Sequence, residues 1–353
     1  MGLSVSSAPV SAAYDGIVCD LDGVVYRGAG AVRGVPDALQ QLAAQGKGIV
    51  YATNNASRVP AEVAAQLAEL GAPSDPHQVV TSAEAGAARL AQRLAPRSAV
   101  LALGGPGVAL ALEAAGLTPV APDEACGDGG TRRRQAVVAV LQGFGRDLTV
   151  RDFEAAARQL ADGVVWVATN GDTTLPLEWG SAPGNGAYVA LLSGVVGRQP
   201  EVVGKPERPL YDLAVGRLGT RPERTLAVGD RLDTDIAGAV AASLDSAWVL
   251  SGVNRPSDLL AAPATCRPTY VVRDLGALLE PYAVPRDEGE RWVCGGARIR
   301  LTADDLVVEE RDADGIEAVR AGLGALVAER ARGMTAVEDL VRLAHALDAL
   351  GTS

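Results

Sequence analysis

Cysteine and long apolar runs are scarce in this chain of 353 residues. The four cysteines are scattered without paired spacing, which argues against a disulfide framework or a zinc motif. The longest uncharged stretch, 179–197, is interrupted by proline, glycine and polar residues, so we expect no membrane span. Residues 1–14 lack the basic start and the apolar core of a secretory signal, and we expect a cytoplasmic protein.

Basic residues are also fewer than acidic residues. The chain has 32 Lys and Arg against 43 Asp and Glu, which gives a net charge of −11. Because proteins that bind nucleic acid usually present a basic face, we expect no such partner. Only two of the basic residues are lysines, Lys47 and Lys205. In a chain that otherwise uses arginine, a remaining lysine is a candidate for a position where a compact ammonium group is needed. Lys47, which lies between Gly46 and Gly48 without an acidic neighbour, is interpreted as an ordinary surface lysine.

Short apolar runs alternate with longer Ala- and Leu-rich stretches at helical spacing as far as about residue 272. The pattern begins with a strand at 17–19, a helix at 35–44 and a strand at 47–52. Such alternation is typical of βαβ units, which build a parallel sheet with helices on both faces. We therefore predict an α/β fold with a Rossmann-like parallel-sheet core.

The pattern changes in 286–353. We expect two strands of a hairpin at 291–301 and 305–310, and two amphipathic helices at 316–330 and 336–350. This segment is interpreted as a small α+β appendage without chemistry of its own. Its apolar helix stripes favour an interaction or regulatory module, or a homo-oligomer.

Two carboxylates follow the first predicted strand. Asp20 and Asp22 stand two residues apart, and side chains that alternate along a strand would project both to the same side. Sites in open parallel sheets form beyond the carboxyl ends of strands, where this pair is expected. Taken alone, Asp22-Gly23 is also compatible with a simple turn.

Three further strand ends carry polar groups. Thr53-Asn54-Asn55 offers donors for an oxyanion, although threonine and asparagine are also common helix caps. Lys205 follows a short apolar run, which favours a position at a strand end over that of an ordinary surface lysine. Asp230 ends another run, and the acids after it could cap the helix that follows.

Together these groups suit phosphoryl transfer through an acyl phosphate. One carboxylate would attack, a hard cation bound by oxygen ligands would neutralise charge, and the lysine and threonine would bind phosphoryl oxygens.

In order and spacing, the segments resemble the four motifs of the haloacid dehalogenase superfamily. These are Asp-x-Asp-Gly at 20–23, the strand-end Thr53, Lys205 and Gly-Asp-x-x-x-x-Asp at 229–235. The surrounding residues resemble the NagD-type branch, which includes glycerol 3-phosphate, phosphoglycolate and 4-nitrophenyl phosphate phosphatases, some from high-GC bacteria. The resemblance implies a Mg²⁺-dependent hydrolase of a small phosphorylated metabolite, with glycerol 3-phosphate expected first. The alternatives are 2-phosphoglycolate or a broad activity on 4-nitrophenyl phosphate.

By this resemblance Asp20 is the nucleophile and Asp22 is the general acid and base. Asp20, Asp230 and the backbone carbonyl of Asp22 would bind Mg²⁺, while Gly23 and Asp235 support the site. The residues expected to bind the phosphoryl group are Thr53, Asn54, Asn55 and Lys205.

The resemblance also divides the chain. Residues 1–82 and 201–285 would form the phosphatase core, 83–200 an inserted α/β cap, and 286–353 the appendage, which lies outside the usual length of the family. Cap loops that contain Asn170 and Asp172 would lie over the site. Where relatives often carry Asp, this chain has Gly145, so contacts of the cap are expected to differ there.

Other classes fit the motifs less well. A dehalogenase does not need the second acid, Asp22, and a P-type ATPase needs membrane spans. A response-regulator receiver is far shorter, and its phosphorylated aspartate comes later in the chain. Residues 104–107, Gly-Gly-Pro-Gly, lack the full spacing of a dinucleotide loop and are interpreted as a tight turn between strand and helix.

Overall fold

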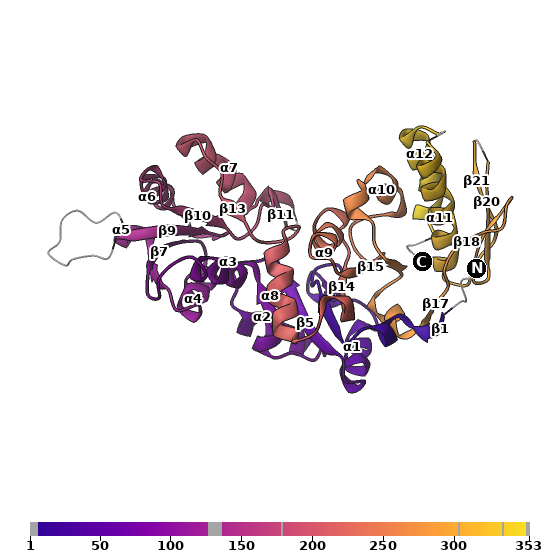
Figure 1. The fold of residues 1–353 in the computed structure, drawn as a ribbon, viewed down its shortest axis with the longest axis horizontal. Helices are drawn as coiled ribbons and strands as arrows, with labels where there is room; N and C mark the ends of the chain where they lie inside the picture. The colour runs from indigo at the N-terminus through magenta and orange to yellow at the C-terminus, as the bar shows by residue number, and fades with distance from the viewer. Residues whose placement is uncertain (1–5, 126–135, 178, 303, 334, 351–353) are drawn as a thin grey trace. The chain divides into compact units, whose positions relative to one another are not determined.

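The structure is a computed structural model that describes residues 6–125, 136–177, 179–302, 304–333 and 335–350 (Figure 1). Cys126 lies outside these residues. The chain forms two compact units. The first unit comprises Met1–Ile49, Leu70–Pro73 and Leu218–Ser353, and the second comprises Val50–Glu69 and Ser74–Arg217.

The first unit is built on parallel strands in the order β16-β15-β14-β2. Next to β2 comes β5, which begins in this unit and ends in the second. The bounds are Gly16–Cys19 for β2, Gly48–Thr53 for β5, Thr225–Gly229 for β14, Asp245–Val249 for β15 and Tyr270–Val272 for β16. Continuous burial of β2 and β14 explains why their sequences are apolar without alternation. Val228 pairs with Cys19, so β2 and β14 end side by side.

Short elements complete this part of the first unit. They are the helices α1 (Val35–Ala44), α9 (Ala237–Ala241) and α10 (Pro256–Ala261), a π-helical turn η4 (Leu232–Ile236), and the antiparallel strand pairs β1 (Ser6–Pro9) with β17 (Pro281–Tyr282) and β3 (Tyr26–Arg27) with β4 (Gly30–Ala31). Helix α1 follows Gly34 at φ 76° and carries proline in its first turn, where the missing N–H costs no hydrogen bond.

The C-terminal segment forms a four-stranded antiparallel sheet and two helices. They are β18 (Arg286–Asp287), β19 (Trp292–Cys294), β20 (Ala297–Leu301), β21 (Leu306–Glu310), α11 (Ile316–Arg332) and α12 (Val337–Asp348). Its apolar side chains share one hydrophobic core with the parallel-sheet part of the unit, in which Leu340 and Leu343 of α12 join Trp248 and Leu260. The apolar stripes of both helices are thus packed inside the unit.

The second unit contains a five-stranded parallel sheet in the order β13-β10-β9-β7-β8. Its strands are β7 (Ala99–Leu103), β8 (Thr118–Val120), β9 (Val137–Gln142), β10 (Val165–Ala168) and β13 (Glu201–Val202), and β6 (Val79–Thr81) pairs with the end of β5. The helices are α2 (Pro60–Glu69), α3 (Ser82–Ala91), α4 (Pro106–Ala114), α5 (Pro122–Ala125), α6 (Val150–Ala161), α7 (Asn185–Val196) and α8 (Arg208–Leu218). A hairpin of β11 (Thr174–Leu177) and β12 (Gly180–Pro183) precedes α7.

The predicted α/β fold with parallel sheets is confirmed. Residues 104–107 form the expected tight turn, because β7 ends at Leu103 and α4 begins at Pro106. No helix among the described residues is both long and apolar enough to span a membrane. The boundaries of core, cap and appendage stay a prediction.

Candidate active site

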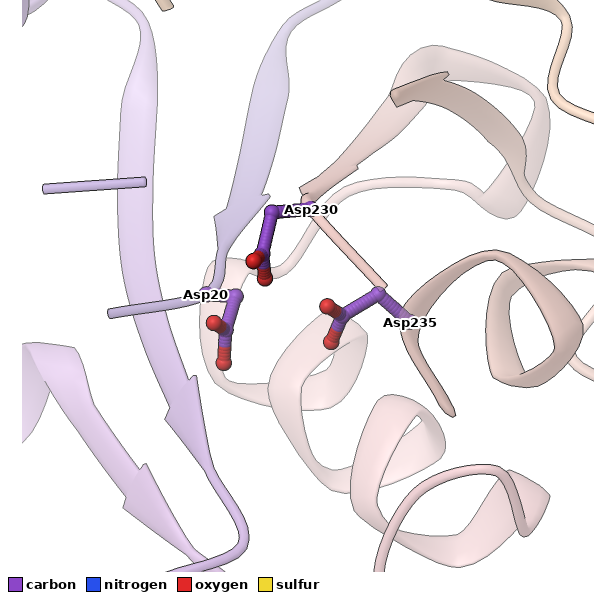
Figure 2. Close-up of side chains that lie close together, drawn as sticks. All are labelled: Asp20, Asp230 and Asp235. Carbon is purple, nitrogen blue, oxygen red and sulfur yellow. The ribbon is translucent and has the colours of Figure 1, made fainter. Parts of the chain in front are cut away.

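Three carboxylates of the first unit come together beyond the ends of β2 and β14. Asp20 follows β2, Asp230 follows β14, and Asp235 lies in the turn η4. Each offers one oxygen, and these oxygens all lie within 4.8 Å of one another. Figure 2 shows the three carboxylates pointing toward a common space. Asp20 is half-buried, whereas Asp230 is 1% and Asp235 2% exposed.

Backbone contacts hold this acid cluster in place. The Asp20 N–H donates to the Val228 carbonyl at 2.8 Å, which continues the pairing of β2 with β14. Asp235 accepts from the backbone N–H of Arg231 at 3.1 Å. The neighbouring Asp233 points elsewhere, since it is exposed and pairs with the Arg231 guanidinium at 2.8 Å. The structure therefore places Asp235, and not Asp233, in the acid cluster beside Asp230.

The cluster fits a hard divalent cation. Carboxylates held this close repel one another, and two of them are largely withdrawn from water. Carboxylate oxygens without sulfur or imidazole donors are the ligands that Mg²⁺ and Ca²⁺ prefer. Asp20 and Asp230, which the sequence predicts as metal ligands, are both present, together with the predicted supporting residue Asp235.

Asp22 and Gly23 form a turn beside the acid cluster. Asp22 is exposed and is not one of the three clustered acids. The Gly23 N–H donates to the Tyr26 carbonyl at 2.8 Å, and Gly23 has a φ of +83°. A Cβ at Gly23 would lie 2.5 Å from Asp230 Oδ2, so only glycine allows this close approach. The backbone of the turn thus lies against Asp230.

The second unit brings together the residues predicted to bind phosphate, with Asn54 at their centre. The Lys205 N–H donates to Asn54 Oδ1 at 2.8 Å, and Asn54 Nδ2 donates to the Lys205 carbonyl at 3.0 Å. Asn54 Nδ2 also donates to Asp172 Oδ2 at 3.1 Å, while Asn170 Nδ2 donates to the Asn54 carbonyl at 2.7 Å. The loop after β5, the loop after β10 and Lys205 are therefore one hydrogen-bonded group.

Lys205 and Thr53 are both buried. Lys205 is 4% exposed, and its Nζ donates to the Ala52 carbonyl at 3.1 Å. The preceding Gly204 has no room for a side chain, because a Cβ would lie 2.4 Å from the Thr169 carbonyl oxygen. Thr53 Oγ1 accepts from the Asn55 N–H at 3.1 Å. The side chain of Asn55 is used locally, since its Oδ1 accepts from the N–H and the hydroxyl of Ser57.

Gly145 has a structural explanation. A Cβ at this position would lie 2.8 Å from the backbone of Gly104 and from that of Gly105. A larger residue would therefore push apart the loops that follow β7 and β9, so this close approach requires glycine.

Sequence reasoning missed the residues that support Asp230. Trp248 Nε1 donates to the Asp230 carbonyl at 2.9 Å, and the Val253 N–H donates to Asp230 Oδ2 at 2.8 Å. Ser251 Oγ donates to the Gly23 carbonyl at 2.9 Å. The sequence does contain a signal for them, because residues 251–254 follow the apolar run 247–250 in the same way as the other motifs follow theirs.

Comparison with known proteins agrees with these motifs. A family model of haloacid dehalogenase-like hydrolases matches residues 17–118, and a HAD-hydrolase-like model matches residues 202–278. The chain is 40% identical over 325 residues to D-glycerol 3-phosphate phosphatase of Mycobacterium tuberculosis, covering 90% of this chain and 87% of that protein. It is 39% identical over 256 residues to glycerol-3-phosphate phosphatase of Gallus gallus, covering 69% of this chain and 82% of that protein.

A solved structure is similar over nearly the whole chain. It is glycerol phosphate phosphatase from Mycobacterium tuberculosis in complex with magnesium, which has a TM-score of 0.80 and 35% identity and covers 97% of this chain and 99% of that one. The resemblance that the motifs indicated is confirmed. The chain belongs to the haloacid dehalogenase-like hydrolases.

Proposed function

We propose that this chain is a Mg²⁺-dependent phosphatase of small phosphomonoesters, with glycerol 3-phosphate as its substrate. The acid cluster at the ends of β2 and β14 carries the proposal, because it combines a nucleophile with ligands for a hard cation. The substrate is supported by the 40% identity to a D-glycerol 3-phosphate phosphatase. We further expect no nucleic-acid partner, because the net charge is −11. A cytoplasmic location and a homo-oligomer stay predictions from the sequence, and the apolar stripes of α11 and α12, which suggested the oligomer, are packed inside the first unit.

Asp20 attacks phosphorus in the proposed reaction. The bond between phosphorus and the glycerol oxygen breaks, Asp22 gives its proton to the leaving alkoxide, and an aspartyl phosphate forms on Asp20. Asp22 then takes a proton from the water that attacks this intermediate, which releases inorganic phosphate and restores both residues. Mg²⁺ bound by Asp20, Asp230 and the carbonyl of Asp22, with Asp235 supporting its water shell, would offset the charge of the phosphate.

The phosphoryl oxygens are bound by the group centred on Asn54. Lys205 supplies a positive charge and Thr53 supplies a hydroxyl group. Asn54 and Asn55 supply hydrogen-bond donors from the loop after β5. Support comes from the burial of Lys205 and from the two hydrogen bonds that join its backbone to Asn54. Asn170 and Asp172 are proposed as supporting residues, because both are hydrogen-bonded to Asn54.

A panel of phosphate esters tests the substrate. We expect the highest kcat/KM on glycerol 3-phosphate, lower values on 2-phosphoglycolate and 4-nitrophenyl phosphate, and the lowest on a nucleoside monophosphate, measured as release of inorganic phosphate. A preference for the nucleotide would refute the substrate but leave the chemistry intact. Absence of phosphate release from every ester would refute the function.

Removal of the metal should stop turnover. Without a cation, the acid cluster repels a phosphate dianion, so EDTA is expected to abolish phosphate release and excess Mg²⁺ to restore it. Circular dichroism before and after EDTA controls for unfolding. Full activity of the metal-free protein would contradict the assignment of Asp20 and Asp230 as ligands.

Lys205→Arg should lower kcat/KM at least ~100-fold, equivalent to about 2.7 kcal/mol. A guanidinium is larger and planar, and the position is 4% exposed with the Asn54 loop packed against it. The other lysine gives a matched control. Lys47 is half-buried and donates to the Tyr14 carbonyl, an interaction that arginine can keep, so Lys47→Arg should be near wild type. Equal kinetics of the two variants would count against the role of Lys205.

A further inference from the structure

Residues 251–254, which follow β15, lie directly against the acid cluster. The Val253 N–H donates to a carboxylate oxygen of Asp230 at 2.8 Å, and the Ser251 hydroxyl donates to the Gly23 carbonyl at 2.9 Å. A Cβ at Gly252 would lie 2.0 Å from Asp230. The backbone of this segment thus determines how the Asp230 carboxylate is oriented.

Asn254 joins this segment to the loop that follows Asp230. Its Oδ1 accepts from the Leu232 N–H at 2.8 Å, and its Nδ2 donates to Asp258 Oδ2 at 3.0 Å. Because a carboxylate can only accept, Asp258 fixes the orientation of the amide and aims its oxygen at Leu232. One side chain therefore links the turn η4 to helix α10.

The C-terminal segment in turn holds α10 at both ends. At the first turn, Asp348 of α12 accepts from the N–H of Ser257 at 3.0 Å and from its hydroxyl at 2.8 Å. At the other end, Arg330 of α11 donates to the carbonyls of Leu260 and Ala262 at 2.6 and 2.9 Å. Of these two contacts, only the one made by Asp348 lies at the end of α10 that is next to Asn254.

We propose that Asn254 is a positioning residue for the metal site and that α12 sets its position through Asp348 and α10. The inference rests on the proposed function in taking Asp230 as a metal ligand. It assigns the C-terminal segment a part in metal binding, although none of its residues belongs to the acid cluster. Groups that orient metal ligands typically change metal affinity ~10- to 100-fold when they are removed.

Calorimetric titration of the full chain with Mg²⁺ alone tests the proposal without a substrate. We expect Asn254→Ala to raise the Kd ~10-fold and Asp348→Ala, one step further away, to raise it ~3-fold. Arg330→Ala is the matched control, because it also removes hydrogen bonds to α10 but at the opposite end. It should lower the Tm without changing the Kd for Mg²⁺.

An unchanged Kd in Asn254→Ala, or equal changes in Asp348→Ala and Arg330→Ala, would overturn the proposal. If Asp348→Ala fails to fold, Ser257→Ala replaces it, because it removes only the hydroxyl that donates to Asp348. A wild-type Kd in Ser257→Ala, with its Tm lowered, would show that the contact is merely structural. Wild-type protein that binds no Mg²⁺ would instead refute the metal site of the proposed function.

Discussion

Asp20→Asn should reduce phosphate release from every phosphomonoester by at least ~10⁴-fold, since losses of this size follow removal of a nucleophile. The amide keeps the size of the side chain but is a far weaker nucleophile than a carboxylate. It also takes one negative charge from the acid cluster, in which each of the three oxygens lies within 4.8 Å of the others. The fold should survive, because the contact of Asp20 with β14 is made by its backbone N–H.

Asp233→Asn is the matched control for this variant. It makes the same chemical change close to Asp235, but its side chain is 66% exposed and pairs only with the Arg231 guanidinium among the described residues. Exposed ion pairs contribute at most about 1 kcal/mol, so near-wild-type kinetics are expected. Steady-state phosphate release measures both variants. An Asp20→Asn protein within tenfold of wild type would exclude Asp20 as the nucleophile.

The positions of Asp20 and Asp230 in the fold could be predicted because each of these candidate site residues follows an apolar strand of a parallel sheet. The ends of β2 and β14 carry Asp20 and Asp230, and the pairing of Val228 with Cys19 brings those ends together. Continuous apolar runs identify such strands, and in a parallel sheet the residues that follow them meet at the same edge.

The hydrogen-bonded partners of these residues could not be predicted in the same way. Asn54 contacts Lys205, which is 151 residues away in the chain, and Asn170, which is 116 residues away. No local periodicity encodes such a contact. Likewise, the orientation of Asn254 depends on which of its neighbours accepts a hydrogen bond, and that becomes visible only when α10 is in place.

Local signals were also overlooked in the C-terminal segment. A single strand was expected over 291–301, whereas the structure has β19 and β20 with Gly295-Gly296 between them. Gly295 has a φ of +51°, which suits a tight turn of a hairpin, and a Gly-Gly pair between apolar runs is a recognised signal for one. Outside this segment, strand β8 could not be predicted, because it has three residues and includes Pro119, which weakens any strand pattern.

Asp22→Asn should separate the two steps of the reaction. The leaving group of glycerol 3-phosphate is a basic alkoxide that needs a proton, whereas nitrophenolate leaves readily without one. We therefore expect kcat/KM to fall ~10³-fold on glycerol 3-phosphate and less than ~10-fold on 4-nitrophenyl phosphate, as for loss of a general acid. Asp22 is exposed and is not one of the three clustered acids, so its role as acid and base is tested apart from metal binding by its side chain.

The second step should fail on both substrates, because the same residue takes the proton of the attacking water. With 4-nitrophenyl phosphate, the Asp22→Asn protein is expected to release about one equivalent of nitrophenolate in a burst and then to stall with phosphate on Asp20. Mass spectrometry of the acid-quenched protein locates that phosphate. Asp20→Asn gives the control, since it can form no aspartyl phosphate at that position and should show no burst. Equal losses of kcat/KM on the two substrates, with Asp20 never phosphorylated, would show that Asp22 is not the acid and base of this reaction.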